Sequence, residues 1–197
     1  MNTELTYKYY RKLNSKTVYL VLHGGGAEGI ETSFISNIIN SLVTKGDSVF
    51  GFNFPYCERG DENSSGEELT EETVALEDVV QYLRSEGYEK IVIVAKSLGG
   101  ITTSYWLEQH PASDVEVVVL GYVLGSVKTS ALANNLRAVI QGENDRFGNA
   151  AAVEEELTSS SISANVIEVP QADHSYRNTE KEPVYQGQAI ELLLQAL

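Results

Sequence analysis

The chain has 197 residues and a formal net charge of −14, with 28 acidic against 14 basic side chains. This surplus of negative charge repels phosphate backbones and anionic lipid surfaces, so we expect no nucleic acid and no membrane among its partners. A single cysteine, Cys57, excludes an internal disulfide and a cysteine-built zinc site, and no run approaches the roughly 18 apolar residues of a membrane span. One domain over residues 1–197 is expected, and a polar start without a secretory signal favours the cytoplasm.

Strands and helices are predicted to alternate along the chain. Strands are expected at 6–11, 17–22, 49–54, 91–95, 115–120, 138–142 and 165–169. Helices are expected at 34–43, 69–86, 101–110, 150–157 and 183–197, with a loop at 56–66 and a short turn at 131–135. This alternation predicts an α/β fold: a mostly parallel, doubly wound sheet with helices on both faces.

The strand at 91–95 and the following helix are joined by a very short turn. Residues 91–95 are apolar and mostly β-branched without alternation, which predicts a central strand buried on both faces. A tight turn at this point forces Ser97 into a strained backbone conformation with its hydroxyl above the sheet edge. The sequence Ala95-Lys96-Ser97-Leu98-Gly99 matches the nucleophile-elbow pattern G-x-S-x-G, with alanine as the first small residue. A loop with a helix-capping serine is the simpler alternative.

A serine nucleophile needs a base, and the base needs an acid to hold it. The chain has three histidines, and His174 is the best candidate because it follows the last strand in a loop. Asp145 lies on the loop after the preceding strand and is the expected acid, so that three strand ends converge on one point. Glu143 and Asp173 compete for this role, and Asp145 is also a candidate cap for the next helix.

Backbone N–H groups are expected to stabilise an oxyanion near this serine. They would come from Leu98, directly after the nucleophile, and from Gly25, in the glycine run that follows the strand at 17–22. The run His23-Gly24-Gly25-Gly26 is itself an oxyanion-loop pattern of lipases and esterases.

With these motifs in the order Ser97, Asp145, His174, the chain resembles a small lidless serine α/β-hydrolase, a group that includes dienelactone hydrolases and acyl-protein thioesterases. The resemblance spans nearly the whole chain and implies the α/β-hydrolase fold without a lid domain. It also implies an esterase-type activity that needs no cofactor and no metal. Serine at the elbow departs from the cysteine of true dienelactone hydrolases, which argues against that substrate chemistry.

The expected substrate is a small-molecule ester or thioester with a short acyl group, because the chain has no insertion large enough for a lid. Tyr56, Cys57 and Tyr176 follow strand ends and either wall a small pocket or are ordinary loop residues. The negative charge of the chain disfavours strongly anionic substrates unless Lys96 or Arg146, beside the site, offsets it locally.

Three other functions compete with this hypothesis. The run Gly24–Gly29 also fits G-x-G-x-x-G, the fingerprint of a dinucleotide-binding module, but the next strand ends in Asn53-Phe54-Pro55 without the acid that such a module needs. The second is a non-catalytic scaffold that acts by binding a partner, and the third is a peptidase.

Overall fold

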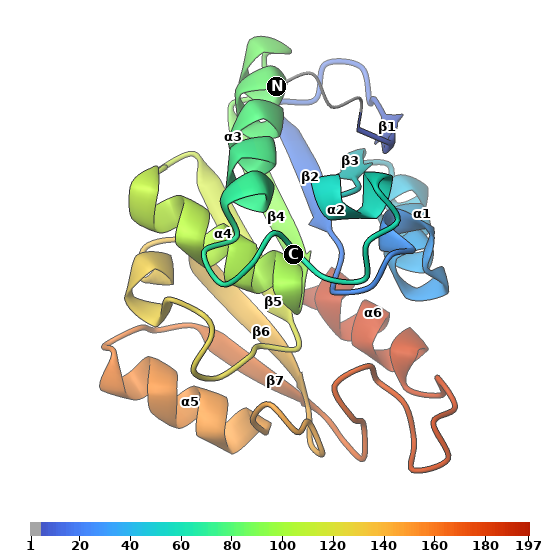
Figure 1. Ribbon diagram of the computed structural model, residues 1–197, viewed down its shortest axis with the longest axis vertical. Helices are drawn as coiled ribbons and strands as arrows, with labels where there is room; N and C mark the ends of the chain where they lie inside the picture. The colour runs from blue at the N-terminus through green and yellow to red at the C-terminus, as the bar shows by residue number, and fades with distance from the viewer. Residues whose placement is uncertain (1–4) are drawn as a thin grey trace.

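The computed structural model describes residues 5–197, so the first four residues of the predicted 1–197 domain lie outside the described part. Seven strands within it form one sheet in the order β1-β3-β2-β4-β5-β6-β7 (Figure 1). The strands are β1 (Tyr7–Tyr10), β2 (Thr17–Leu22), β3 (Ser48–Phe52), β4 (Lys90–Lys96), β5 (Val115–Leu120), β6 (Leu136–Gly142) and β7 (Asn165–Val169). Neighbouring strands run parallel except at one edge, where β1 pairs antiparallel with β3. The predicted mostly parallel α/β sheet is confirmed.

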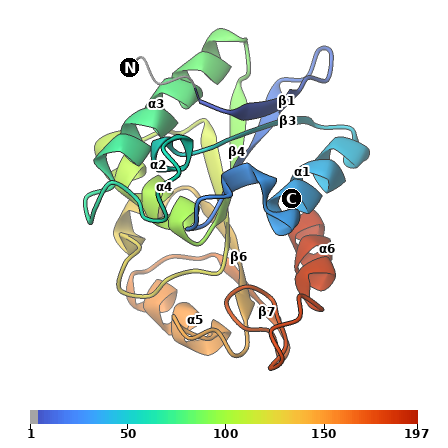
Figure 2. The same cartoon turned by 45° about the vertical axis from the view of Figure 1, so that its right-hand side comes forward.

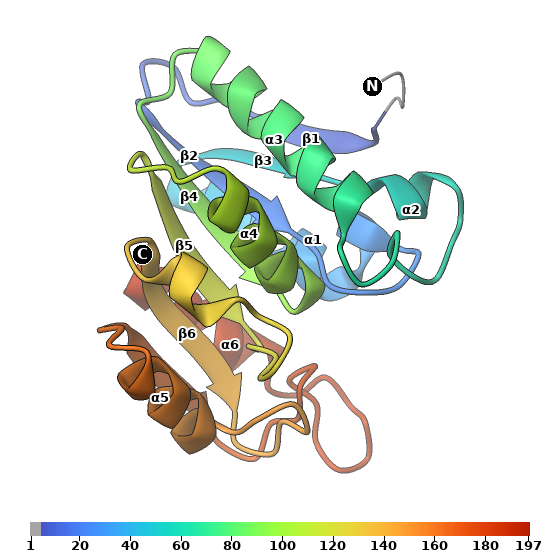
Figure 3. The same ribbon diagram turned by 60° about the vertical axis from the view of Figure 1, so that its left-hand side comes forward.

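Helices cover both faces of this sheet. They are α1 (Ser33–Lys45), α2 (Pro55–Glu58), α3 (Thr70–Ser85), α4 (Leu98–Gln109), α5 (Ala150–Ser159) and α6 (Gln186–Ala196), with short 3₁₀ helices η1 (Gly29–Glu31) and η2 (Thr129–Leu132). Figure 3 shows α3, α4 and α5 in front of the sheet and α1 and α6 behind it, and Figure 2 shows α1 beside α6. In the described residues, no helix has both the length and the apolar character needed to cross a membrane.

The central strand β4 divides the hydrophobic core into two layers. Because side chains alternate along a strand, Ile91, Ile93 and Ala95 pack into the layer under α3 and α4. Val92 and Val94 pack into the layer under α1 and α6. All five are buried, so the uninterrupted apolar run is explained by a strand covered on both sides.

Some predicted boundaries differ from the structure. The last helix begins at Gln186 rather than at residue 183, because hydrogen bonds between Asn178 and Glu182 hold the preceding residues in a loop. The expected loop at 56–66 starts with α2, which has Pro55 in its first turn. The strand expected to reach residue 54 ends at Phe52, because the Phe54 N–H turns away to a side chain of the neighbouring loop.

The tight junction between β4 and α4 can be tested with two glycines, Gly99 and Gly187, which are the second residues of α4 and α6. A Cβ added at Gly99 would lie 2.8 Å from the Leu22 Cβ and 3.0 Å from the His23 carbonyl oxygen, whereas one added at the exposed Gly187 in α6 would meet nothing within 4 Å. We expect Gly99→Ala to lower the free energy of unfolding by about 1–3 kcal/mol through overpacking. Gly187→Ala should raise it by up to about 1 kcal/mol through helix propensity. Urea unfolding measures both, and equal effects of the two variants would contradict the close packing.

Candidate active site

Ser97 stands between β4 and α4 in a backbone conformation that is rare for any residue except glycine. Its φ is 48° and its ψ is −108°. The Ser97 N–H donates to the Leu120 carbonyl at 3.0 Å, and the Gly99 N–H donates to the His23 carbonyl at 3.1 Å, so both neighbouring strands hold the turn. The Ser97 side chain makes no capping hydrogen bond to α4. The simpler alternative of a helix-capping serine is therefore not met, and the hydroxyl is left for another partner.

That partner is His174, on the loop after β7. The Ser97 Oγ lies 2.8 Å from His174 Nε2, and His174 Nδ1 lies 2.6 Å from Asp145 Oδ2. An ionised carboxylate only accepts hydrogen bonds, so Nδ1 carries the proton and Nε2 accepts from the serine hydroxyl. The Asp145 side chain is fully buried, and it also accepts from the Gln141 side chain at 3.0 Å and from the Phe147 N–H at 2.9 Å. The three residues predicted from the sequence thus form one hydrogen-bonded chain.

The environment of His174 favours a neutral imidazole. Burial lowers the pKa of His174 below its ordinary value of 6.5, and the positive charges of Lys96 and Arg146 act in the same direction. The hydrogen bond to Asp145 opposes this shift without cancelling it. At neutral pH the ring is therefore ready to accept a proton.

The competing acids are occupied elsewhere. Glu143 accepts from the Gln171 N–H at 2.6 Å, and Asp173 accepts from Lys181 at 3.0 Å. The cap of α5 is Asn149, whose side chain accepts from the Ala152 N–H, and not Asp145. Of the three candidate acids, Asp145 is thus the one that contacts the His174 ring.

The glycine run after β2 is held by the ring of His23, the first residue of the predicted oxyanion-loop pattern. His23 is buried, its Nδ1 lies 2.6 Å from the Gly24 carbonyl oxygen, and its Nε2 accepts from the Phe54 N–H at 3.0 Å. Burial lowers the pKa of His23 to about 4, so the ring stays neutral and keeps this donor and acceptor pattern. The N–H groups of Gly25 and Leu98 have no acceptor among residues 5–197. Both predicted oxyanion donors are therefore free to bind a ligand.

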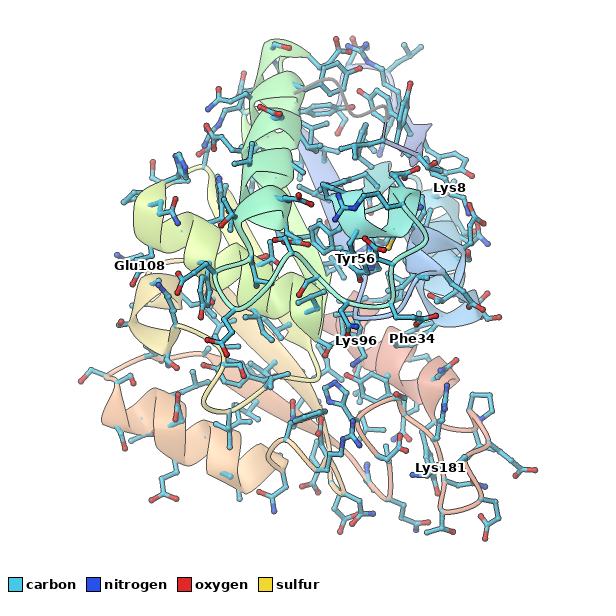
Figure 4. All side chains as sticks on the ribbon, viewed as in Figure 1. Lys8, Phe34, Tyr56, Lys96, Glu108 and Lys181 are labelled. Atoms are coloured by element: carbon cyan, nitrogen blue, oxygen red, sulfur yellow. The ribbon has the colours of Figure 1, made fainter. Side chains whose placement is uncertain are left out.

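A cavity of about 530 Å³ opens beside Ser97 and His174. Lys96 and Phe34 are among the residues that line it, and both are labelled in Figure 4. Cys57 does not line it, and neither do Tyr56 and Tyr176, so the alternative in which these residues wall the pocket is wrong. Both side chains are fully buried because their hydroxyls donate to backbone carbonyls, Tyr56 to Gly24 at 3.1 Å and Tyr176 to Ile140 at 2.8 Å. Within residues 5–197, no group of three or more His, Cys, Asp or Glu side chains could hold a metal ion.

Comparisons with known proteins agree with the observed fold. Residues 15–197 match the model of a family described as an alpha/beta hydrolase domain. No curated protein matches the sequence significantly.

Several solved structures share the fold. A putative alpha/beta hydrolase of unknown function from Agrobacterium tumefaciens is similar at a TM-score of 0.72 and 17% identity, over 97% of this chain and 90% of that one. A serine hydrolase without a lid from Xanthomonas campestris is similar at a TM-score of 0.67 and 14% identity, over 98% of this chain and 96% of that one. An esterase from Pyrococcus furiosus is similar at a TM-score of 0.70 and 16% identity, over 97% of this chain and 87% of that one. At these identities the likeness concerns the fold alone, and it includes a relative described as lacking a lid.

Proposed function

The chain belongs to the alpha/beta hydrolase family, and from this premise we propose that it is a serine hydrolase that cleaves a carboxylic ester or thioester of a small, short-acyl substrate. Family membership supports a hydrolytic activity. The observation that carries the finer proposal is the continuous hydrogen-bonded chain from Ser97 through His174 to Asp145, with two free backbone N–H groups next to it.

This geometry supports covalent catalysis through an acyl group on Ser97. The Ser97 Oγ attacks the substrate carbonyl while its proton passes to His174 Nε2, and the buried Asp145 stabilises the imidazolium that results. The imidazolium then gives this proton to the leaving alcohol or thiol, which leaves an acyl group on Ser97. A water molecule, deprotonated by the same imidazole, attacks the acyl carbon. The bond from this carbon to Ser97 Oγ breaks, the imidazolium returns its proton to Oγ, and the acid is released.

The developing oxyanion needs donors that are already in place. The N–H groups of Leu98 and Gly25 would supply them, since both have no acceptor among the described residues and Gly25 lines the cavity. Loss of one such donor typically costs roughly a hundredfold to a thousandfold in rate. The His23 ring supports this role because it fixes the Gly24 carbonyl and thereby the orientation of the loop.

The glycine run supports this proposal better than it supports a dinucleotide site. It lies against the cavity beside Ser97 through Gly24 and Gly25, and α1 begins only at Ser33, after the separate turn of η1. A dinucleotide fingerprint leads directly into the helix that binds the pyrophosphate.

The first test is turnover of 4-nitrophenyl acetate. We expect Ser97→Ala to lower kcat by several orders of magnitude without unfolding the chain, because the nucleophile is lost while the turn is kept. Ser159→Ala, a change of the same kind at an exposed position of α5, should turn over like the wild type. Undiminished turnover by Ser97→Ala would refute the assignment.

The same assay with a series of esters from acetyl to palmitoyl tests the acyl length. Residues 121–135, between β5 and β6, contain η2 as their only helix, so this segment supplies no pair of helices to cover the cavity. We expect kcat/KM of the wild type to be highest for the short acyl groups. A preference for dodecanoyl or longer chains would contradict the short-acyl proposal.

The pH dependence of kcat/KM tests the base. Since a neutral His174 is required and its pKa is lowered, activity should be low in acid and rise to a plateau through a midpoint below 6.5. A midpoint above that value, or a rate that is flat between about pH 5 and about pH 9, would exclude His174 as the base in this environment.

A further inference from the structure

We propose that the cavity beside Ser97 recognises a carboxylate group of the substrate, held by the Lys96 ammonium and by the free N–H groups of the first turn of α1. This inference rests on the proposed function, because it names the substrate class of the same site. The negative charge of the chain is expected to disfavour anionic substrates unless a nearby cation offsets it, and here Lys96 is that cation.

Lys96 is a buried cation without a counter-ion. The residue is only 7% exposed, and its ammonium forms no ion pair with any Asp or Glu of residues 5–197. Burial without such a partner is costly for an ammonium, and it lowers the pKa of Lys96 to about 8 despite the opposing attraction of Asp145 and Asp173. A ligand anion would relieve this cost.

The ammonium is held next to the reacting groups. Its Nζ donates to the His174 carbonyl at 2.9 Å and lies 3.3 Å from His174 Nε2, the atom that the Ser97 hydroxyl also reaches. An ammonium has three N–H bonds, and the carbonyl uses one of them. Lys96 is one of the residues that line the cavity, so a carboxylate bound beside Ser97 would accept from a remaining N–H of this ammonium.

The first turn of α1 provides donors in the same cavity. Thr32, Ser33, Phe34 and Ile35 line it, and the N–H groups of Ser33, Phe34 and Ile35 have no acceptor among the described residues. The Thr32 side chain does not cap the helix. Free N–H groups at the start of a helix favour an anion, and here they share one cavity with an unpaired buried ammonium.

The charged residues at the cavity wall agree with an anionic ligand. Arg177 and Lys181 also line it, and Glu28 is the single acid among the lining residues, all of which lie in the described part of the chain. Lys181 is paired with Asp173, so Arg177 is the second of the cavity's lining cations, after Lys96, that forms no ion pair within residues 5–197. The chain as a whole has twice as many acidic as basic residues, so this cavity has the opposite balance.

The short distances set the size of the substrate. Since Lys96 Nζ and Ser97 Oγ both lie within about 3.3 Å of one imidazole nitrogen, only a few bonds can separate the carboxylate from the scissile carbonyl. The class is therefore a half-ester or half-thioester of a short dicarboxylic acid, or a short ester whose alcohol part bears the carboxylate.

Matched substrates test this inference. The glutaryl and glutaramoyl thioesters of N-acetylcysteamine have nearly the same shape. The acyl group of the first ends in a carboxylate, and that of the second ends in a neutral amide. O-acetylglycolate and O-acetylglycolamide make the same comparison on the alcohol side. We expect the wild type to prefer the anion roughly tenfold or more in kcat/KM in one of the two pairs, the size of one charge-assisted hydrogen bond.

Two variants locate the donors. Lys96→Met should reduce this preference to about one, whereas Lys45→Met, the same charge change at an exposed position at the end of α1, should keep it. Ser33→Pro should reduce it severalfold, because proline is tolerated at the first position of a helix and removes one N–H. The extended conformation of Thr32, with φ −54° and ψ 140°, suits a following proline, so this variant should fold even if Lys96→Met does not.

A fluorophosphonate probe distinguishes failure of the carboxylate site from failure of the proposed function. If the probe labels Ser97 and the wild type shows no preference for the anion in either pair, the carboxylate site is overturned and the proposed function stands. A preference that survives in both Lys96→Met and Ser33→Pro would also overturn this site. If the probe does not label Ser97 and none of the four substrates is hydrolysed, the proposed function itself fails.

Discussion

The backbone of Ser97 is the constraint on which the site depends. A positive φ at a residue with a side chain costs on the order of 1–3 kcal/mol, and it persists only where the surroundings enforce it. Here the enforcement comes from the core: β4 is buried on both faces, and Gly99 lets α4 pack directly on the end of β2. The hydroxyl therefore stands at the sheet edge as a consequence of the packing of its neighbours.

The parallel sheet brings the other groups to the same edge. The glycine run follows β2, Ser97 follows β4, Asp145 follows β6 and His174 follows β7. Three of these groups line the cavity, and Asp145 contacts it through His174. Buried polar side chains then fix each group: His23 holds the glycine run, and Gln141 holds Asp145. The site is thus preorganised by hydrogen bonds that the core keeps away from water.

Much of this arrangement could be predicted from the sequence because it depends on local patterns. Apolar runs and glycines gave the order of the elements, and the convergence of parallel strand ends placed Ser97, Asp145 and His174 together. The burial of Tyr56 and Tyr176 could not be predicted, because their acceptors, Gly24 and Ile140, are more than 30 positions away. The buried path of Lys96 depends in the same way on its distant partner His174.

Covalent labelling by a fluorophosphonate tests most directly whether Ser97 is an activated nucleophile. The probe should add one label to the wild type, located by peptide mass spectrometry on the peptide that contains Ser97, and the reaction should be much slower in His174→Ala, which lacks the base. Ser97→Ala should take up no label. A wild-type protein that stays unlabelled, or one labelled at another serine, would contradict the account and favour a non-catalytic scaffold.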